Sequence, residues 1–158
     1  MVKNAPVLLI SCSLVLMNCH RAHATDEWHV EATPGVISQE IHFTNGDARL
    51  SGTVYLPEHG DHLPAVVALP GSSDPTRGSA LFQHLGDNLP LMGIAVLTYD
   101  RRGSGKSSGS LENIDYDTLA DDAIAGQRAL AKLPCIDPHR IGFWGLRQSI
   151  CPGGAQRR

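Results

Sequence analysis

The sequence predicts an α/β fold, in which a mostly parallel sheet is preceded by an antiparallel N-terminal hairpin. Two observations lead to this prediction. Short apolar runs alternate with amphipathic helical stretches, an order that is typical of parallel strands joined by right-handed crossovers. In addition, Asn45-Gly46 separates two strand-like runs, and this dipeptide favours a tight turn between antiparallel strands.

The expected strands are short and rich in apolar residues. The hairpin strands are expected at 40–43 and 49–56, on either side of Asn45-Gly46. The run at 65–69 is apolar throughout, which is typical of a strand covered on both faces. We expect two further strands, at 94–99 and 140–144, with a turn at 136–139 leading into the last of them.

Two helices are expected between these strands. The first spans 79–89, where leucine and phenylalanine side chains form one apolar stripe, and Pro90 or Gly93 ends it. The second spans 115–133 and is stopped by Pro134. Its acidic residues lie early and its basic residues late, which suits the dipole of a helix.

The first 24 residues are predicted to be a secretory signal peptide. A short basic start is followed by an apolar run that ends at Met17, and Ala22-His23-Ala24 offers a cleavage site after Ala24. A membrane anchor is the weaker alternative because polar residues end the run early. Lipid attachment at Cys19 is also weaker, because Asn18 is a poor residue before it. We expect a secreted or periplasmic protein without a membrane span in the mature chain.

The remaining chain divides into three parts. Residues 25–37 are polar and carry Pro34-Gly35, so we expect a disordered leader there. Residues 38–148 hold the alternating strands and helices, and 149–158 form an atypical tail that lacks an apolar helical pattern. Loss of the signal peptide leaves 11 basic and 16 acidic side chains, a net charge of −5. This charge argues against a nucleic-acid partner. The mature chain keeps Cys135 and Cys151, and whether they pair is left open.

The glycine-rich loop after the expected strand 94–99 is interpreted as structural. Its Gly105-Lys106-Ser107 looks like the end of a phosphate-binding loop, but the glycine that such a loop needs earlier is replaced by Asp100. A carboxylate there would repel phosphate, so no nucleotide cofactor is expected. The glycines allow a sharp turn, which Asp100 and an adjacent arginine would hold. The structural loop residues are Asp100, Arg101, Arg102, Gly103, Gly105 and Ser107.

Histidines and acids do not form a convincing metal site. The segment His59-Gly60-Asp61-His62 supplies three candidate ligands in a polar loop but no fourth. Therefore neither a metal nor another cofactor is expected.

Two motifs together resemble the α/β-hydrolase superfamily, in particular its exported serine esterase and peptidase-like members. One is Tyr99-Asp100-Arg101-Arg102-Gly103-x-Gly105-x-Ser107 after a strand. The other is the approach Ile136-Asp137-Pro138-His139-Arg140-Ile141-Gly142-Phe143-Trp144-Gly145-Leu146. The resemblance covers about residues 38 to 148 and implies the N-terminal half of a truncated α/β-hydrolase fold.

The resemblance implies a Gly-x-Ser-x-Gly turn at the end of the last strand, where the serine is the nucleophile. Gly145 is the first glycine of this turn, but Arg147 stands at the nucleophile position, and guanidinium is no nucleophile. By resemblance, the backbone N–H groups of Ser72 and Gln148 would form the oxyanion hole. In this pattern Pro70 stands where relatives often have histidine.

A serine hydrolase also needs an acid and a histidine after the nucleophile in chain order, and residues 149–158 contain neither. We expect a fragment of a serine hydrolase that acts on ester, thioester or peptide bonds, and we expect it to be inactive as it stands. Its substrate would be a small molecule or a peptide if the full domain existed. The alternative is a non-catalytic secreted binding or interaction module.

Overall fold

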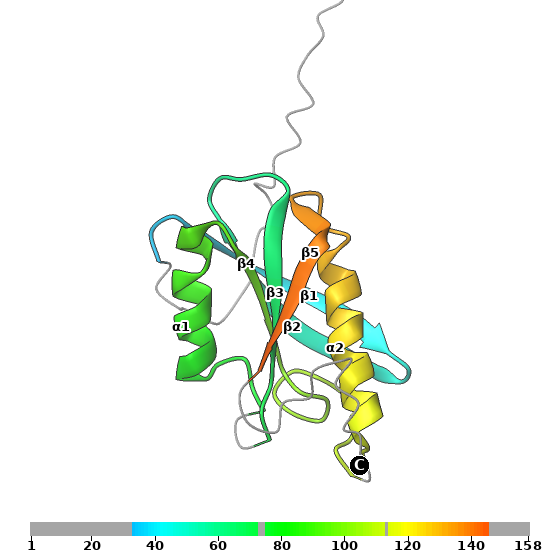
Figure 1. The fold of residues 1–158 in the computed structure, drawn as a ribbon. Helices are drawn as coiled ribbons and strands as arrows, with labels where there is room; N and C mark the ends of the chain where they lie inside the picture. Colours follow the sequence, from blue (N-terminus) through cyan, green and yellow to red (C-terminus); the bar gives the residue numbers. More distant parts are fainter. Residues whose placement is uncertain (1–32, 73–74, 113, 146–158) are drawn as a thin grey trace, which may run out of the picture.

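A computed structural model of the chain describes residues 33–72, 75–112 and 114–145. These residues form a mixed sheet of five strands with two helices (Figure 1), which confirms the expected fold class. The elements in chain order are β1 (Val36–Asn45), β2 (Ala48–Pro57), β3 (Leu63–Leu69), α1 (Ala80–Asn88), the 3-10 turn η1 (Pro90–Met92), β4 (Ala95–Tyr99), α2 (Tyr116–Leu130) and β5 (Ile136–Gly145).

The strand order in the sheet is β1-β2-β4-β3-β5. Strand β2 pairs antiparallel with both β1 and β4, whereas β3 lies parallel to β4 on one side and to β5 on the other. The hairpin at the start of the chain and the parallel strands that follow it are therefore both present. Because β4, β3 and β5 run parallel to one another, their carboxyl ends lie at one common edge of the sheet.

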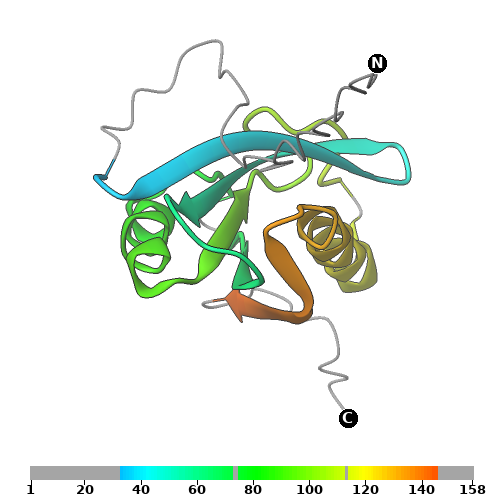
Figure 2. The same ribbon diagram turned by 90° about the horizontal axis from the view of Figure 1, so that it is seen from above.

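Each face of the sheet carries one helix (Figures 1 and 2). Helix α1 places Phe82 against Tyr55, Ala68 and Val96 on one face. Helix α2 covers the other face, where the larger part of the core lies. That core joins aliphatic and aromatic side chains of the strands to the helix and includes Phe43, Leu50, Val54, Val67, Leu97, Ala123 and Leu130.

Side-chain caps fix where both helices begin. The Ser79 hydroxyl accepts a hydrogen bond from the backbone N–H of Phe82 at α1, and Asp115 accepts one from Thr118 at α2. Within the described ranges, neither helix has the length and hydropathy needed to cross a membrane.

The hairpin turn is shifted by one residue from the predicted position. Asn45 pairs with Ala48, so the two turn residues are Gly46 and Asp47. Only Gly46 has a positive φ, of 59°, which suits a turn that needs glycine at its first central position. The Asn45 side chain instead donates a hydrogen bond to Asp122 of α2 over 2.8 Å. This long-range contact explains the shift.

Two strands, β1 and β5, begin four residues earlier than expected. Strand β1 starts at Val36, inside the expected leader, directly after a turn in which the Val36 N–H donates to the Thr33 carbonyl. Strand β5 starts at Ile136, and the expected turn at 136–139 takes the form of an irregular register within the strand. There, Asp137 accepts hydrogen bonds from the His139 backbone and the Arg140 side chain. The expected signal peptide and the tail after Gly145 lie outside the described residues.

Candidate functional site

The carboxyl ends of the parallel strands define the candidate site. Leu69, the last residue of β3, is the register partner of Gly145, the last residue of β5. Strand β4 ends on the other side of β3, at Tyr99. Ligand sites of such sheets lie outside the carboxyl ends of their strands. The loop that follows β3 therefore starts next to the point where the chain leaves β5, and the loop that follows β4 starts one strand further along the same edge.

The structure places two of the predicted site residues at this edge. Gly145 ends β5, and Ser72 is an exposed residue shortly after Leu69 on the neighbouring strand. The predicted nucleophile position Arg147 and the predicted oxyanion-hole residue Gln148 lie outside the described residues. The described geometry thus brings together the strand that leads to the predicted Gly-x-Ser-x-Gly position and the loop that, by resemblance, would supply one N–H donor.

Asp100 binds the loop after β4 to the loop after β3. Its side chain is buried, and its two carboxylate oxygens each accept a backbone hydrogen bond of 2.9 Å, from Arg77 and from Lys106. The Arg77 guanidinium lies 3.6 Å from the same carboxylate. The next residue, Arg101, donates its backbone N–H to the Pro75 carbonyl over 2.8 Å. The partner of Asp100 is therefore Arg77 rather than an adjacent arginine.

Gly105 has to be a glycine because of this arrangement. Its φ of 54° is in the left-handed region, and a Cβ at this position would lie 2.5 Å from the Asp100 carboxylate. Gly103 has a φ of 69°, and its N–H donates to the Ser108 carbonyl. The two glycines thus let the backbone fold closely around one buried acid.

Ser107 joins the same loop to β2. Its hydroxyl donates to the Asp100 carbonyl over 2.7 Å and accepts from the Ser51 N–H over 3.0 Å. The Ser51 hydroxyl donates to the Lys106 carbonyl, so His42, 3.1 Å away, has to be the donor through its Nδ1–H. Burial, followed by the charge of Arg49, lowers the pKa of His42, which favours this neutral ring.

Arg102 holds the loop against α2 through a buried ion pair. Its Nε donates to one oxygen of Asp122 over 2.8 Å and its Nη2 to the other over 2.6 Å. Asp122 is 1% exposed and Arg102 5% exposed. These hydrogen bonds raise the pKa of Arg102 above its ordinary value. The two charges are therefore paired in bidentate geometry, which a buried charge requires.

Sequence reasoning missed the partners of these loop residues. Arg77 binds both Asp100 and Glu40, and Asp122 binds both Arg102 and Asn45. Arg77 stands alone in a polar loop, and Asp122 looks like one of several solvated acids on a helix. No local pattern identifies either one, because each partner lies far away along the chain.

The ion pair between Arg77 and Glu40 leads to a prediction about pH. A hydrogen bond of 2.9 Å from Arg77 is the main reason that the pKa of Glu40 lies below its ordinary value of 4.5. A lowered folded-state pKa stabilises the protein above pH 4.5, and this stabilisation is lost as pH falls through the folded-state pKa. Glu40→Gln should therefore lower the melting temperature at pH 7, and the difference from wild type should shrink below pH 4.

The matched control is Glu58→Gln, which removes an exposed acid that has no ion pair among the described residues. Melting curves from pH 3 to pH 7 would measure the effect. A difference between Glu40→Gln and wild type that stays constant over this range would contradict the ion-pair interpretation.

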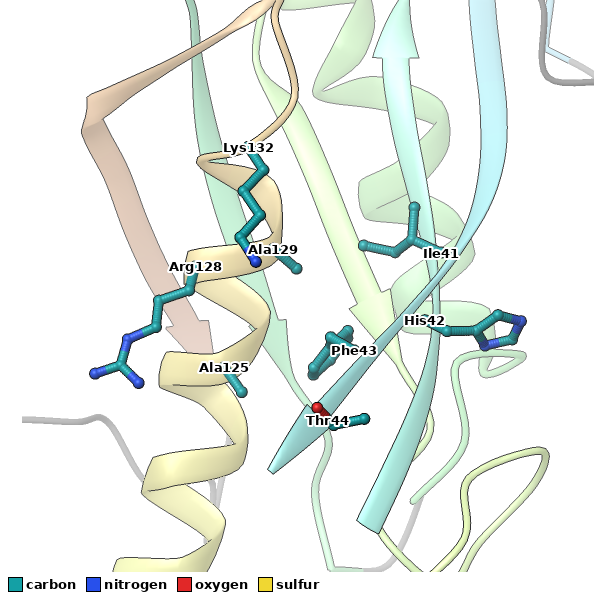
Figure 3. A pocket seen from close by; sticks show the side chains of 8 residues that line it. All are labelled: Ile41, His42, Phe43, Thr44, Ala125, Arg128, Ala129 and Lys132. Carbon is teal, nitrogen blue, oxygen red and sulfur yellow. The ribbon is translucent and has the colours of Figure 1, made fainter. Parts of the chain in front are cut away.

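No group of three potential metal ligands comes together within the described ranges. Asp61 and His62 are highly exposed and lie before β3, 3.7 Å apart. A surface pocket of about 410 Å³ lies elsewhere, between β1 and α2 (Figure 3). None of the loop residues described above lines it.

Comparisons with curated proteins give partial matches, and no family model matches the chain. Over 60 residues the chain is 44% identical to the polyketide transferase claH of Penicillium crustosum, which covers 37% of this chain and 19% of that protein. Over 87 residues it is 32% identical to the thiohydrolase apmlB of Arthrinium phaeospermum, covering 54% and 28%. The matched region thus spans less than a third of either relative.

Solved structures give broader matches. The structure of DcsB in complex with its substrate analogue has a TM-score of 0.62 and 26% identity, covering 70% of this chain and 37% of that one. The α/β hydrolase GrgF from Penicillium sp. sh18 has a TM-score of 0.61 and 27% identity, with the same coverage of 70% and 37%. The described sheet is therefore similar to part of these larger folds.

Proposed function

Because the chain belongs to the α/β-hydrolase superfamily and carries part of its fold, we propose that it is the N-terminal part of a serine hydrolase. A complete serine hydrolase of this kind would transfer an acyl group to water from an ester, thioester or peptide bond. One observation carries the proposal. The register between Leu69 and Gly145 sets the loop that contains Ser72 beside the strand that leads to position 147.

This arrangement suits acyl transfer. The nucleophile has to stand on a sharp turn after a strand, and two N–H donors have to face the oxygen that becomes negative. The β3 loop supplies the first donor through the backbone of Ser72, and the residue after the nucleophile position, Gln148, supplies the second. The names of the two relatives, a thiohydrolase and a polyketide transferase, favour a thioester among the three substrate classes.

We also propose that the 158-residue chain is catalytically silent. Arg147 offers no nucleophile, because its guanidinium stays protonated. The loops that directly follow β3 and β4 also contain no histidine that could act as the general base. His59 and His62 precede β3, and His139 lies near the start of β5, at the opposite end of these strands. His84 contacts Asn88 on α1, and His42 contacts Ser51.

Export belongs to the same proposal. The N-terminal 24 residues have the pattern of a signal peptide that is cleaved after Ala24. Secretion or periplasmic localisation would give the enzyme access to small-molecule or peptide substrates outside the cytoplasm. The N-terminal sequence of the secreted protein tests this part, and a mature protein that starts at Met1 would contradict it.

An ester-hydrolysis assay tests the catalytic part. The purified 158-residue chain should release p-nitrophenol from p-nitrophenyl acetate no faster than the same sample after heat treatment. Arg147→Ser should also stay at this background rate, because a serine without a base is a poor nucleophile. Saturable, heat-sensitive turnover by the wild-type chain would contradict the proposal.

A further inference from the structure

A groove between β1 and α2 offers a second surface, and none of the loop residues of the candidate site lines it. We define this β1–α2 groove by residues 41–44 of β1 and by Ala125, Arg128, Ala129 and Lys132 of α2. Its volume is about 410 Å³. In Figure 3, Ile41 and Phe43 point from β1 toward the helix, while His42 points away from it.

The strand side of the groove runs along a backbone edge. Successive side chains of a strand point to opposite faces, yet four consecutive residues of β1 line this groove. The groove therefore borders the backbone of β1 and not only one face of it. Strand β1 pairs with β2 on one side, and no described strand pairs with its other side. Such an edge is a template for an added strand.

The helix side combines small and basic residues on one stripe. Ala125 and Ala129 are small, and Arg128 and Lys132 are both exposed, although the Arg128 side chain points away from β1 in Figure 3. Neither cation forms an ion pair with a residue of the described ranges. No acid lines the groove. The lysine and arginine that line the groove thus have no acidic counterpart in it, and this favours negative side chains in a bound partner.

We propose that the β1–α2 groove binds an extended acidic peptide segment of a partner protein, which adds to the sheet as a strand beside β1. The spacing supports this partner. Four helical residues rise about 6 Å, and two strand residues advance about 6.7 Å. Acids at alternate positions of the peptide therefore match Arg128 and Lys132. An apolar side chain on the same face meets Phe43. This surface is independent of the proposed hydrolase function.

A labelled peptide tests the proposal with the full chain. The probe is a fluorescein-labelled peptide of sequence Thr-Asp-Thr-Asp-Thr-Val-Thr with blocked ends, and fluorescence anisotropy measures its binding. Arg128→Glu should weaken binding about tenfold, in the range seen for lost charge pairs at interfaces. Arg140→Glu is the matched control, because Arg140 is an exposed arginine of β5, which lies at the opposite edge of the sheet from β1. It should change the affinity less than about twofold.

Two further measurements separate strand addition from general charge attraction. The same peptide with asparagine in place of aspartate should bind about tenfold more weakly. Hydrogen exchange should show that the aspartate peptide protects backbone amides of residues 41–44. The proposal is overturned if the wild-type chain does not bind the peptide, if Arg140→Glu weakens binding as much as Arg128→Glu, or if those amides gain no protection.

Discussion

Asp122→Ala should cost about 3 to 5 kcal/mol of unfolding free energy, the range for breaking a buried ion pair from one side. The substitution leaves the Arg102 guanidinium buried at 5% exposure without its bidentate partner. It also removes the carboxylate that accepts the Asn45 side-chain hydrogen bond. The hairpin, the loop after β4 and helix α2 would lose their common contact at once. Urea denaturation would measure the loss.

The matched control for this change is Asp121→Ala. Asp121 is the preceding residue of α2, but its side chain is exposed, so its removal should change stability by less than about 0.5 kcal/mol. If both substitutions change the free energy of unfolding equally, Asp122 stabilises the protein only through its charge on the helix. That result would contradict the role assigned to the buried pair.

Leu97→Ala should cost about 2 to 5 kcal/mol, because it removes a large side chain from the centre of the core. Leu97 has no exposed surface. Its two methyl groups lie against Gly52 of β2 and Gly126 of α2, close enough that a Cβ at either glycine would press on them. The side chain therefore fills the space between sheet and helix, and its loss leaves a cavity there.

Leu91→Ala is the control for the loss of a leucine. Leu91 lies in the turn after α1 and is 57% exposed, so the same truncation should cost less than about 1 kcal/mol. Thermal and urea denaturation of both variants would compare them. If Leu97→Ala lowers the free energy of unfolding no more than Leu91→Ala does, Leu97 does not lie at the centre of the core.

The sequence predicted the strands and helices well because each one carries its own local signal. Continuous apolar runs mark β3 and β4, and periodic apolar positions with caps mark α1 and α2. The misplacements came from contacts that no local pattern contains. The hairpin turn moved by one residue because Asn45 binds Asp122. The turn before the last strand appears within β5 because Ile136 still pairs with Leu63.

From the sequence, candidate site residues could be predicted only where they lie at or shortly after the end of a strand. The order of the strands shows why Ser72 and Gly145 belong to one edge, since β3 and β5 are neighbours there. The acid that organises the loops, Asp100, could be singled out by its place directly after β4. Its partner Arg77 could not, because this contact depends on how the loop after β3 folds back.

The central claim is that these 158 residues correspond to the front part of a serine hydrolase. Sequencing the genomic DNA beyond codon 158 tests it most directly. The expected result is a continuing coding region, in the same or a shifted frame, which specifies an apolar helix and then an acid followed by a histidine. A region with no such segment in any frame would contradict the claim and would favour a binding module.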